Sequence, residues 1–142
     1  MKSKFDLVFL SDDDLDDIFL HKRKIEKFCF TEELFVYTNA KEALDYLRAA
    51  EENNSMFDYV LPEIIFLDIN MPKMDGWMFL EAYGKLNEQI KSKIKIFMLS
   101  ASSNIEEQNR AYYNNNITSF YSKPLTNEML ENIRQFVMSD ML

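Results

Sequence analysis

Short apolar runs alternate along the chain with segments whose apolar residues recur every three or four positions. Runs of this short length are typical of buried strands, and the helical spacing predicts amphipathic helices between them. The expected strands cover residues 5–10, 33–38, 63–68, 94–99 and 119–122. Because strands that alternate with helices form parallel sheets with both faces covered, the pattern predicts an α/β domain.

Five helices are expected, each after one of these strands. Asp14 stands at the start of the first helix, and Asn39 and Thr126 are expected to cap the second and the last. The apolar residues that recur at helical spacing in the first helix are Leu15, Ile18, Phe19 and Ile25, and the third helix carries Trp77, Phe79, Leu80 and Tyr83. The expected inner faces of the second and last helices are Ala43, Leu44 and Leu47, and Met129, Leu130, Ile133, Phe136 and Val137. The fourth helix, about residues 104–114, ends in asparagines (114–116), which are expected to supply the left-handed residue that is more often Gly.

Composition supports one globular domain over residues 1–142, with no separate output domain. The chain is 47% hydrophobic, and no linker divides it, although a polar loop is expected over residues 51–59. Its net charge of -8 argues against sequence-independent binding to nucleic acid. The single Cys29 is expected to be a small buried hydrophobe. No apolar run is long enough for a signal peptide or a membrane span, so a cytoplasmic location is expected.

Five aspartates crowd into the stretch FLSDDDLDDIF, residues 9–19, directly behind the first expected strand. In the flavodoxin-like strand order 2-1-3-4-5, the chain order reverses between the first and third strands, where open parallel sheets bind ligands. This topology would bring Asp12 and Asp13 beside Asp68, which ends the third strand. Because three neighbouring carboxylates repel one another, a hard cation such as Mg²⁺ is expected among them. Asp16 and Asp17 are expected to lie in the first turn of the helix instead.

Two further polar residues follow neighbouring strands at the same predicted edge of the sheet. Ser100 comes after the fourth strand and offers a hydroxyl, and Lys123 comes after the fifth and offers an ammonium group. A metal can neutralise phosphate oxygens, a carboxylate can attack phosphorus, and a lysine and a hydroxyl can stabilise the developing charge. The set therefore predicts phosphoryl chemistry.

Four motifs of the chain resemble those of a known protein family. They are LSDDD (10–14), IIFLDINMPKMDGW (64–77), MLSAS (98–102) and YSKPL (121–125). In this order, and over about residues 5–138, the chain resembles the receiver domain of two-component response regulators. The run LDINMPKMDG is the most specific of these signals, whereas an acidic pair or a Lys-Pro alone would be weak.

The resemblance implies that Asp68 accepts a phosphoryl group from a sensor histidine kinase or a histidine phosphotransfer protein. It implies that Asp12, Asp13 and Asp68 hold Mg²⁺, with the backbone carbonyl of Asn70 as a further ligand. The protein would then be no enzyme in the usual sense, since it would catalyse only its own phosphorylation and dephosphorylation.

The resemblance also assigns residues around the phosphoryl group. Ser100 and Lys123 would contact it, and the bond from Lys123 to Pro124 is expected to be cis. Phe120 matches the aromatic that moves inward as Ser100 shifts toward the phosphate. The alternative for Phe120 is a permanently buried core residue.

Three other classes of protein fit the residues less well. A calcium loop beginning at Asp12 would have Asp17 where Gly is required and Arg23 where Glu is required. A haloacid-dehalogenase-like Mg²⁺-dependent phosphatase remains the alternative function, but Asn70 stands where such enzymes have a proton-donating acid. A flavodoxin would need a phosphate beside the aspartate run, which would repel it.

The output of such a receiver is expected to be a protein contact. Only one helix follows the fifth strand, so we expect a stand-alone receiver that signals to an unknown downstream protein or relays its phosphate. The resemblance implies an output face on the fourth helix, the fifth strand and the fifth helix, near Tyr112 and Tyr113. A monomer or a phosphorylation-dependent dimer is expected, without direct nucleic-acid binding or membrane insertion.

Overall fold

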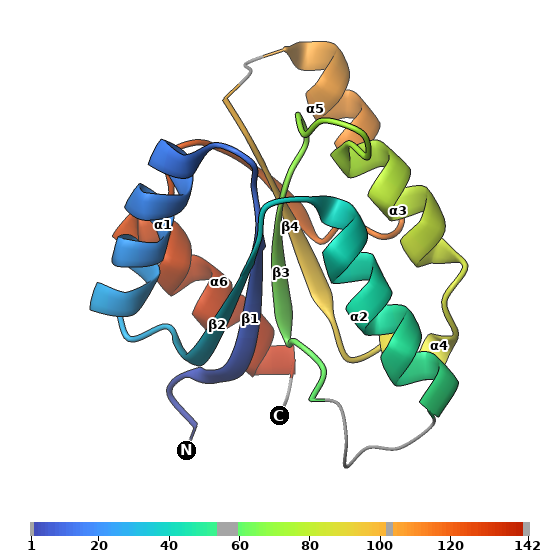
Figure 1. Ribbon diagram of the computed structural model, residues 1–142. Helices are drawn as coiled ribbons and strands as arrows, with labels where there is room; N and C mark the ends of the chain where they lie inside the picture. Colours follow the sequence, from blue (N-terminus) through green and yellow to red (C-terminus); the bar gives the residue numbers. More distant parts are fainter. Residues whose placement is uncertain (1, 54–59, 102–103, 141–142) are drawn as a thin grey trace.

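A computed structural model of the chain describes residues 2–53, 60–101 and 104–140, and the expected parallel sheet forms its centre (Figure 1). The strand order β2-β1-β3-β4-β5 confirms the predicted flavodoxin-like topology, and all four pairings are parallel. The strands are β1 (Phe5–Ser11), β2 (Thr31–Tyr37), β3 (Ile64–Asp68), β4 (Lys95–Ser100) and β5 (Ser119–Ser122). β1 and β3 are neighbours, so the chain order reverses between them as predicted.

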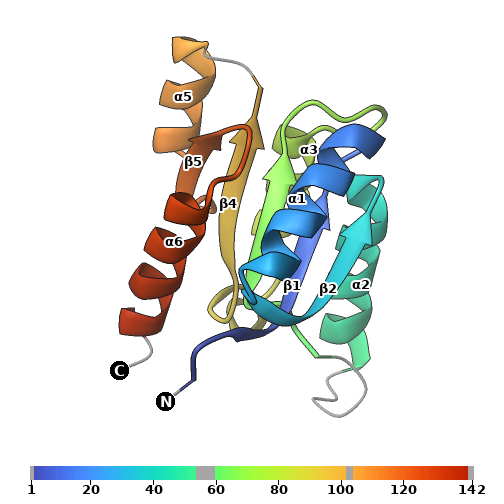
Figure 2. The ribbon, with the colours of Figure 1, turned by 90° about the vertical axis from the view of Figure 1, so that its left-hand side faces the viewer.

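Helices cover both faces of the sheet, as expected. They are α1 (Leu15–Lys27), α2 (Ala40–Asn53), α3 (Gly76–Gly84), α4 (Glu88–Lys91), α5 (Ile105–Tyr112) and α6 (Asn127–Asp140). α1 and α6 lie on one face, while α2, α3 and α5 lie on the other (Figures 1 and 2). The short α4 is an addition to the five predicted helices, and its start is capped by Asn87, whose side chain accepts a hydrogen bond from the N–H of Ile90.

Alternate residues of each strand contribute to two separate cores, because successive side chains of a strand point to opposite faces. Phe9, Leu67 and Met98 lie in the core beneath α2 and α3. Leu10 and Phe66 lie in the core beneath α1 and α6. The central strands of the sheet are therefore buried on both sides.

The three predicted helix caps form, whereas the predicted left-handed residue after α5 does not. The side chain of Asp14 accepts from the N–H groups of Asp16 and Asp17, and those of Asn39 and Thr126 accept at the starts of α2 and α6, which confirms all three caps. The prediction for the asparagines at 114–116 was wrong, because none of them has a positive φ. The turn is made by the backbone of α5 and by hydrogen bonds within the asparagine run.

The inward face of α1 differs from the one predicted. Leu15 is 74% exposed and Phe19 is 64% exposed, whereas His21 and Ile25 are buried. The inward face begins instead at Asp17, four residues before His21. Phe136 of α6 is also exposed, at 52%, so its predicted place on the inner face was wrong. In both helices, apolar residues beside the buried stripe were counted as part of it.

Cys29 is exposed, so the prediction that it is buried was wrong. It follows the C-cap residue of α1 and has a φ of 57°. Its N–H donates to the carbonyl of Glu26, and the N–H of the next residue, Phe30, donates to that of Ile25. This is the Schellman arrangement that ends helices, and the left-handed position directs the Cys29 side chain outward.

The loop expected over residues 51–59 begins later than predicted, since α2 continues to Asn53. The rest of that loop, and Ser102 of the MLSAS motif, lie outside the described residues. Within the part of the chain that the structure describes, no helix combines the length and apolar character that a membrane span requires.

Candidate functional site

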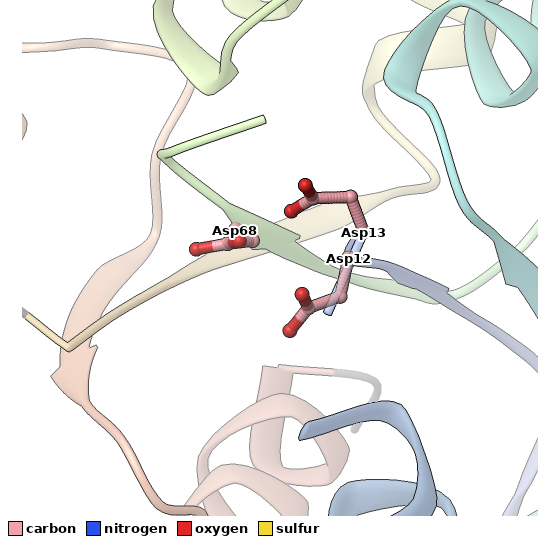
Figure 3. A group of neighbouring side chains, drawn as sticks. All are labelled: Asp12, Asp13 and Asp68. Atoms are coloured by element: carbon pink, nitrogen blue, oxygen red, sulfur yellow. The ribbon is translucent and has the colours of Figure 1, made fainter. Parts of the chain in front are cut away.

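Three carboxylates meet at the carboxyl ends of β1 and β3, where the topology predicted them. Asp12 and Asp13 directly follow β1, and Asp68 is the last residue of β3. Figure 3 shows the three side chains extending from these two strand ends toward the same side of the sheet edge. One oxygen from each lies within 4.8 Å of the others, and Asp12 and Asp68 are buried while Asp13 is exposed. Oxygen atoms in such an arrangement suit a hard divalent cation.

Local hydrogen bonds fix the orientation of Asp12, which is completely buried. Its N–H donates to the carbonyl of Tyr37 at 3.0 Å, which extends the pairing of β1 with β2 by one residue. One of its carboxylate oxygens accepts from the N–H of Asp14 at 3.0 Å. The other accepts from the ammonium of Lys123 at 2.9 Å. Both oxygens of Asp12 are therefore held in place.

The turn that follows Asp68 packs closely against the end of β3. The N–H of Gly76 donates to the carbonyl of Ile69 at 2.8 Å, which folds the turn back against the end of β3. A Cβ atom at Gly76 would lie 3.0 Å from the carbonyl oxygen of Asp68 and 2.9 Å from the Cε of Met98. The close approach therefore requires glycine in the MDG sequence, because a larger residue would push the turn away from Asp68.

Lys123 reaches the carboxylates from β5 on the far side of β4. Its backbone N–H donates to the carbonyl of Ser100 at 2.8 Å, which continues the pairing of β5 with β4. Its ammonium nitrogen lies 2.9 Å from Asp12, 2.8 Å from Asp17 and 3.4 Å from Asp68. The bond from Lys123 to Pro124 is cis, as predicted.

The charges of these groups oppose one another. Burial, and then the nearby charge of Asp12, raise the pKa of Asp68 to about 6, although Lys123 and the N–H of Asn70 partly offset this. Burial alone would lower the pKa of Lys123, but its hydrogen bonds to Asp17 and Asp12 and the charge of Asp68 raise it above its usual value. Lys123 is therefore a permanent cation, while Asp68 is a carboxylate whose charge is only partly balanced.

Ser100 and Phe120 lie on the two strands next to this cluster. Ser100 is buried at the end of β4, one residue beyond Leu99, which pairs with Asp68. Phe120 of β5 pairs with Met98 and is half-buried against the core beneath α2 and α3. Because Phe120 is half-buried and lines an open groove of about 560 Å³ with Tyr112 and other residues, it is not a fully buried core residue in this conformation.

Sequence reasoning missed two residues of this cluster, Asp17 and His21. Asp17 was assigned only to the helix turn, yet its carboxylate accepts from Lys123 at 2.8 Å. His21, one helical turn further on, is 1% exposed, and neither ring nitrogen has a hydrogen-bond partner among the described residues. Burial, followed by the charge of Lys123, lowers its pKa, so it is neutral at pH 7. Asp17, His21 and Ile25 recur at every fourth position and so share one face of α1, but this spacing alone does not distinguish an inward-facing aspartate from a solvated one.

Comparisons with known proteins extend over nearly the whole chain. A family model described as the response regulator receiver domain matches residues 8–135. The chain is also 31% identical over 125 residues to the probable methanogenesis regulatory protein FilR2 of Methanothrix harundinacea (strain 6Ac), a match that covers 88% of this chain and 76% of that protein.

Two solved structures of response regulators have the same fold. A two-component response regulator from Cytophaga hutchinsonii has a TM-score of 0.84 at 29% sequence identity, covering 96% of this chain and 98% of that chain. A response regulator receiver protein from Dyadobacter fermentans DSM 18053 has a TM-score of 0.80 at 26% identity, covering 93% and 97%.

Proposed function

The chain belongs to the response regulator receiver domain family, and on that premise we propose that Asp68 is its phosphoacceptor. The family is a signalling module of two-component systems, so the chain is a phosphorylatable receiver, and the phosphatase alternative is not favoured. Members interact with histidine kinases or histidine phosphotransfer proteins. We propose such a phosphohistidine protein as the donor here, in the cytoplasm as the sequence predicts.

The observation that carries this proposal is the convergence of Asp12, Asp13, Asp68 and Lys123 at one sheet edge. In the proposed step, an Asp68 carboxylate oxygen attacks phosphorus and forms a P–O bond. The P–N bond to the donor histidine breaks, and the ring nitrogen leaves with the electron pair. Lys123 and the Ser100 hydroxyl then bind oxygens of the transferred group, which disperses its negative charge.

The carboxylates of Asp12, Asp13 and Asp68, with the backbone carbonyl of Asn70, would hold Mg²⁺. The arrangement suits a divalent cation, because two buried carboxylates and one exposed carboxylate lie within 4.8 Å of one another. When bound, the ion supplies positive charge that balances the phosphoryl oxygens. The chain's own part is to hold Asp68 beside Lys123 in a buried position.

We propose that the signal leaves through the face formed by α5, β5 and α6, by contact with another protein. Tyr112 and Tyr113 at the end of α5 are 82% and 80% exposed, and Tyr112 lines the groove beside Phe120. An inward movement of Phe120 would change the shape of this face.

The test is Mg²⁺-dependent labelling by acetyl phosphate, followed by intact-mass measurement. The wild-type chain should gain one phosphoryl group, and Asp68→Asn should lose the label, because the amide is not a nucleophile of comparable strength. Asp16→Asn is the matched control, since Asp16 lies in the first turn of α1 and should leave labelling unchanged. Full labelling of Asp68→Asn would rule out the assignment.

A further inference from the structure

Lys123 has a third carboxylate partner that the phosphoryl chemistry does not require. An ammonium group has three N–H donors, and here the two shortest contacts go to Asp17 at 2.8 Å and Asp12 at 2.9 Å. The proposed phosphoacceptor Asp68 is the most distant of the three, at 3.4 Å. In this conformation Lys123 is therefore bound most closely by groups that do not react.

Asp17 differs from Asp12 in a way that matters for any incoming anion. Asp12 is completely buried and has both oxygens fixed, whereas the Asp17 side chain is 32% exposed at the start of α1. Water can hydrate Asp17 if it loses Lys123, and the positive end of the helix dipole also stabilises its charge. Among the partners of Lys123, Asp17 is the one that can be released at the least cost.

Negative charge around Lys123 exceeds the positive charge that this residue supplies. Asp12, Asp17 and Asp68 lie close to the ammonium of Lys123, and Asp13 adds a fourth carboxylate beside Asp12 and Asp68. The neighbouring His21 adds no positive charge at pH 7, because its pKa is lowered. A phosphoryl group at Asp68 would bring further negative charge. Its oxygens would have to take at least one N–H donor of Lys123 from a carboxylate.

We propose that Asp17 is a positioning residue that holds Lys123 on the α1 side of the site and competes with the phosphoryl group for its ammonium. This inference rests on the proposed function of Asp68. When a phosphoryl group is present, Lys123 exchanges Asp17 for a phosphoryl oxygen, and Asp17 turns to solvent. Asp17 thereby weakens the binding of the phosphoryl group and sets how strongly the phosphorylated state is favoured.

The test measures the affinity of the full chain for beryllofluoride, a phosphoryl mimic, at saturating Mg²⁺. Trp77 is the single tryptophan of the chain and follows Gly76, which contacts the backbone of Asp68, so its fluorescence can report binding. Asp17→Asn should lower the dissociation constant by about five- to tenfold, because a charged acceptor no longer competes for Lys123. Asp17→Ala should do the same. An unchanged or raised dissociation constant in both variants would overturn the proposal.

Two controls separate competition for Lys123 from a general loss of negative charge. Asp16→Asn removes the same charge from the same helical turn and should change the dissociation constant less than about twofold. In a Lys123→Gln background, Asp17→Asn should have no effect, because the group for which it competes is gone. Equal tightening with and without Lys123 would contradict the proposal. Asp17→Glu keeps a carboxylate and should restore much of the wild-type affinity.

The wild-type chain distinguishes failure of this inference from failure of the proposed function. If beryllofluoride with Mg²⁺ produced no response in the wild type, the role of Asp68 would be wrong. If the wild type responded but neither Asp17 variant bound more tightly, only the role of Asp17 would be wrong.

Discussion

The two ends of the sheet differ in the residues that they bury. At the carboxyl ends of the strands lie four of the five buried polar or charged residues found in the described part of the chain: Ser11, Asp12, Asp68 and Ser100. At the amino ends, aromatic rings pack together. Phe30, just before β2, lies 5.0 Å from Phe5 at the start of β1 and 5.9 Å from Phe66 in the middle of β3, measured between ring centroids.

This difference separates stability from chemistry along a single set of strands. The aromatic end gains free energy by removing large apolar surfaces from water. The polar end buries carboxylates, which costs free energy unless they are paired. Substitutions at the two ends should therefore have opposite effects on stability, and the following predictions test this contrast.

The largest expected effect is at the aromatic end. Phe30 is completely buried, and Phe30→Ala should lower the free energy of unfolding by about 3–5 kcal/mol, because it removes a ring and leaves a cavity between α1, β1 and β3. Urea denaturation measures the loss. Phe30→Leu is the control and should cost much less. A loss below about 1 kcal/mol for Phe30→Ala would remove the contrast between the two ends.

At the polar end, a substitution is expected to raise the free energy of unfolding. The pKa of Asp68 is raised from 3.8 to about 6 in the folded chain, so this carboxyl group ionises more easily in the unfolded chain. Above about pH 7 the buried carboxylate is charged and destabilises the fold, whereas below pH 3.8 it is protonated in both states and has no such effect. Asp68→Asn should therefore raise the free energy of unfolding at pH 8 by on the order of 3 kcal/mol.

The measurement is urea denaturation in EDTA at several pH values. The advantage of Asp68→Asn over the wild type should decrease as the pH falls from 8 through 6 toward 4. Mg²⁺ should also decrease it at pH 8, because the ion stabilises only the folded wild type. An advantage that did not depend on pH would show that burial of the Asp68 charge is not its cause.

The smallest expected effect tests the backbone at the amino-terminal end of the sheet. Cys29 holds a left-handed conformation with a φ of 57°, which glycine adopts without steric cost. Cys29→Gly should raise the free energy of unfolding by about 0.5–1 kcal/mol, measured by thermal or urea denaturation. Cys29→Ala keeps the unfavourable conformation and should change little. Equal gains from both variants would assign the effect to the exposed thiol.

The strands and the meeting of Asp12, Asp13 and Asp68 were predictable because they depend on local pattern and on topology. Apolar runs identified all five strands, and alternation with helices determined that they are parallel. Parallel strands bring their carboxyl ends to one edge whatever the details of packing. The family motifs then supplied roles that the pattern alone did not.

The inward face of α1 was not predictable in the same way. Hydrophobicity favoured Leu15 and Phe19, but the helix turns Asp17 and His21 inward. The partner of Asp17 is Lys123, which lies 106 residues away in the sequence. A charge that faces inward to meet a distant partner has the same local signal as a solvated one. The left-handed Cys29 was missed for a related reason, since its place depends on where α1 ends.

The position of Lys123 after the last strand has a consequence for how the molecule is made. Asp12 and Lys123 are 111 residues apart, so the acidic cluster is synthesised long before the cation that balances it. A nascent chain folded only as far as β4 would hold Asp12, Asp13 and Asp68 without their lysine. The arrival of β5 both completes the edge of the sheet and delivers Lys123 to the carboxylates. In the newly made chain, completion of the sheet and delivery of this cation to the carboxylates are therefore one event.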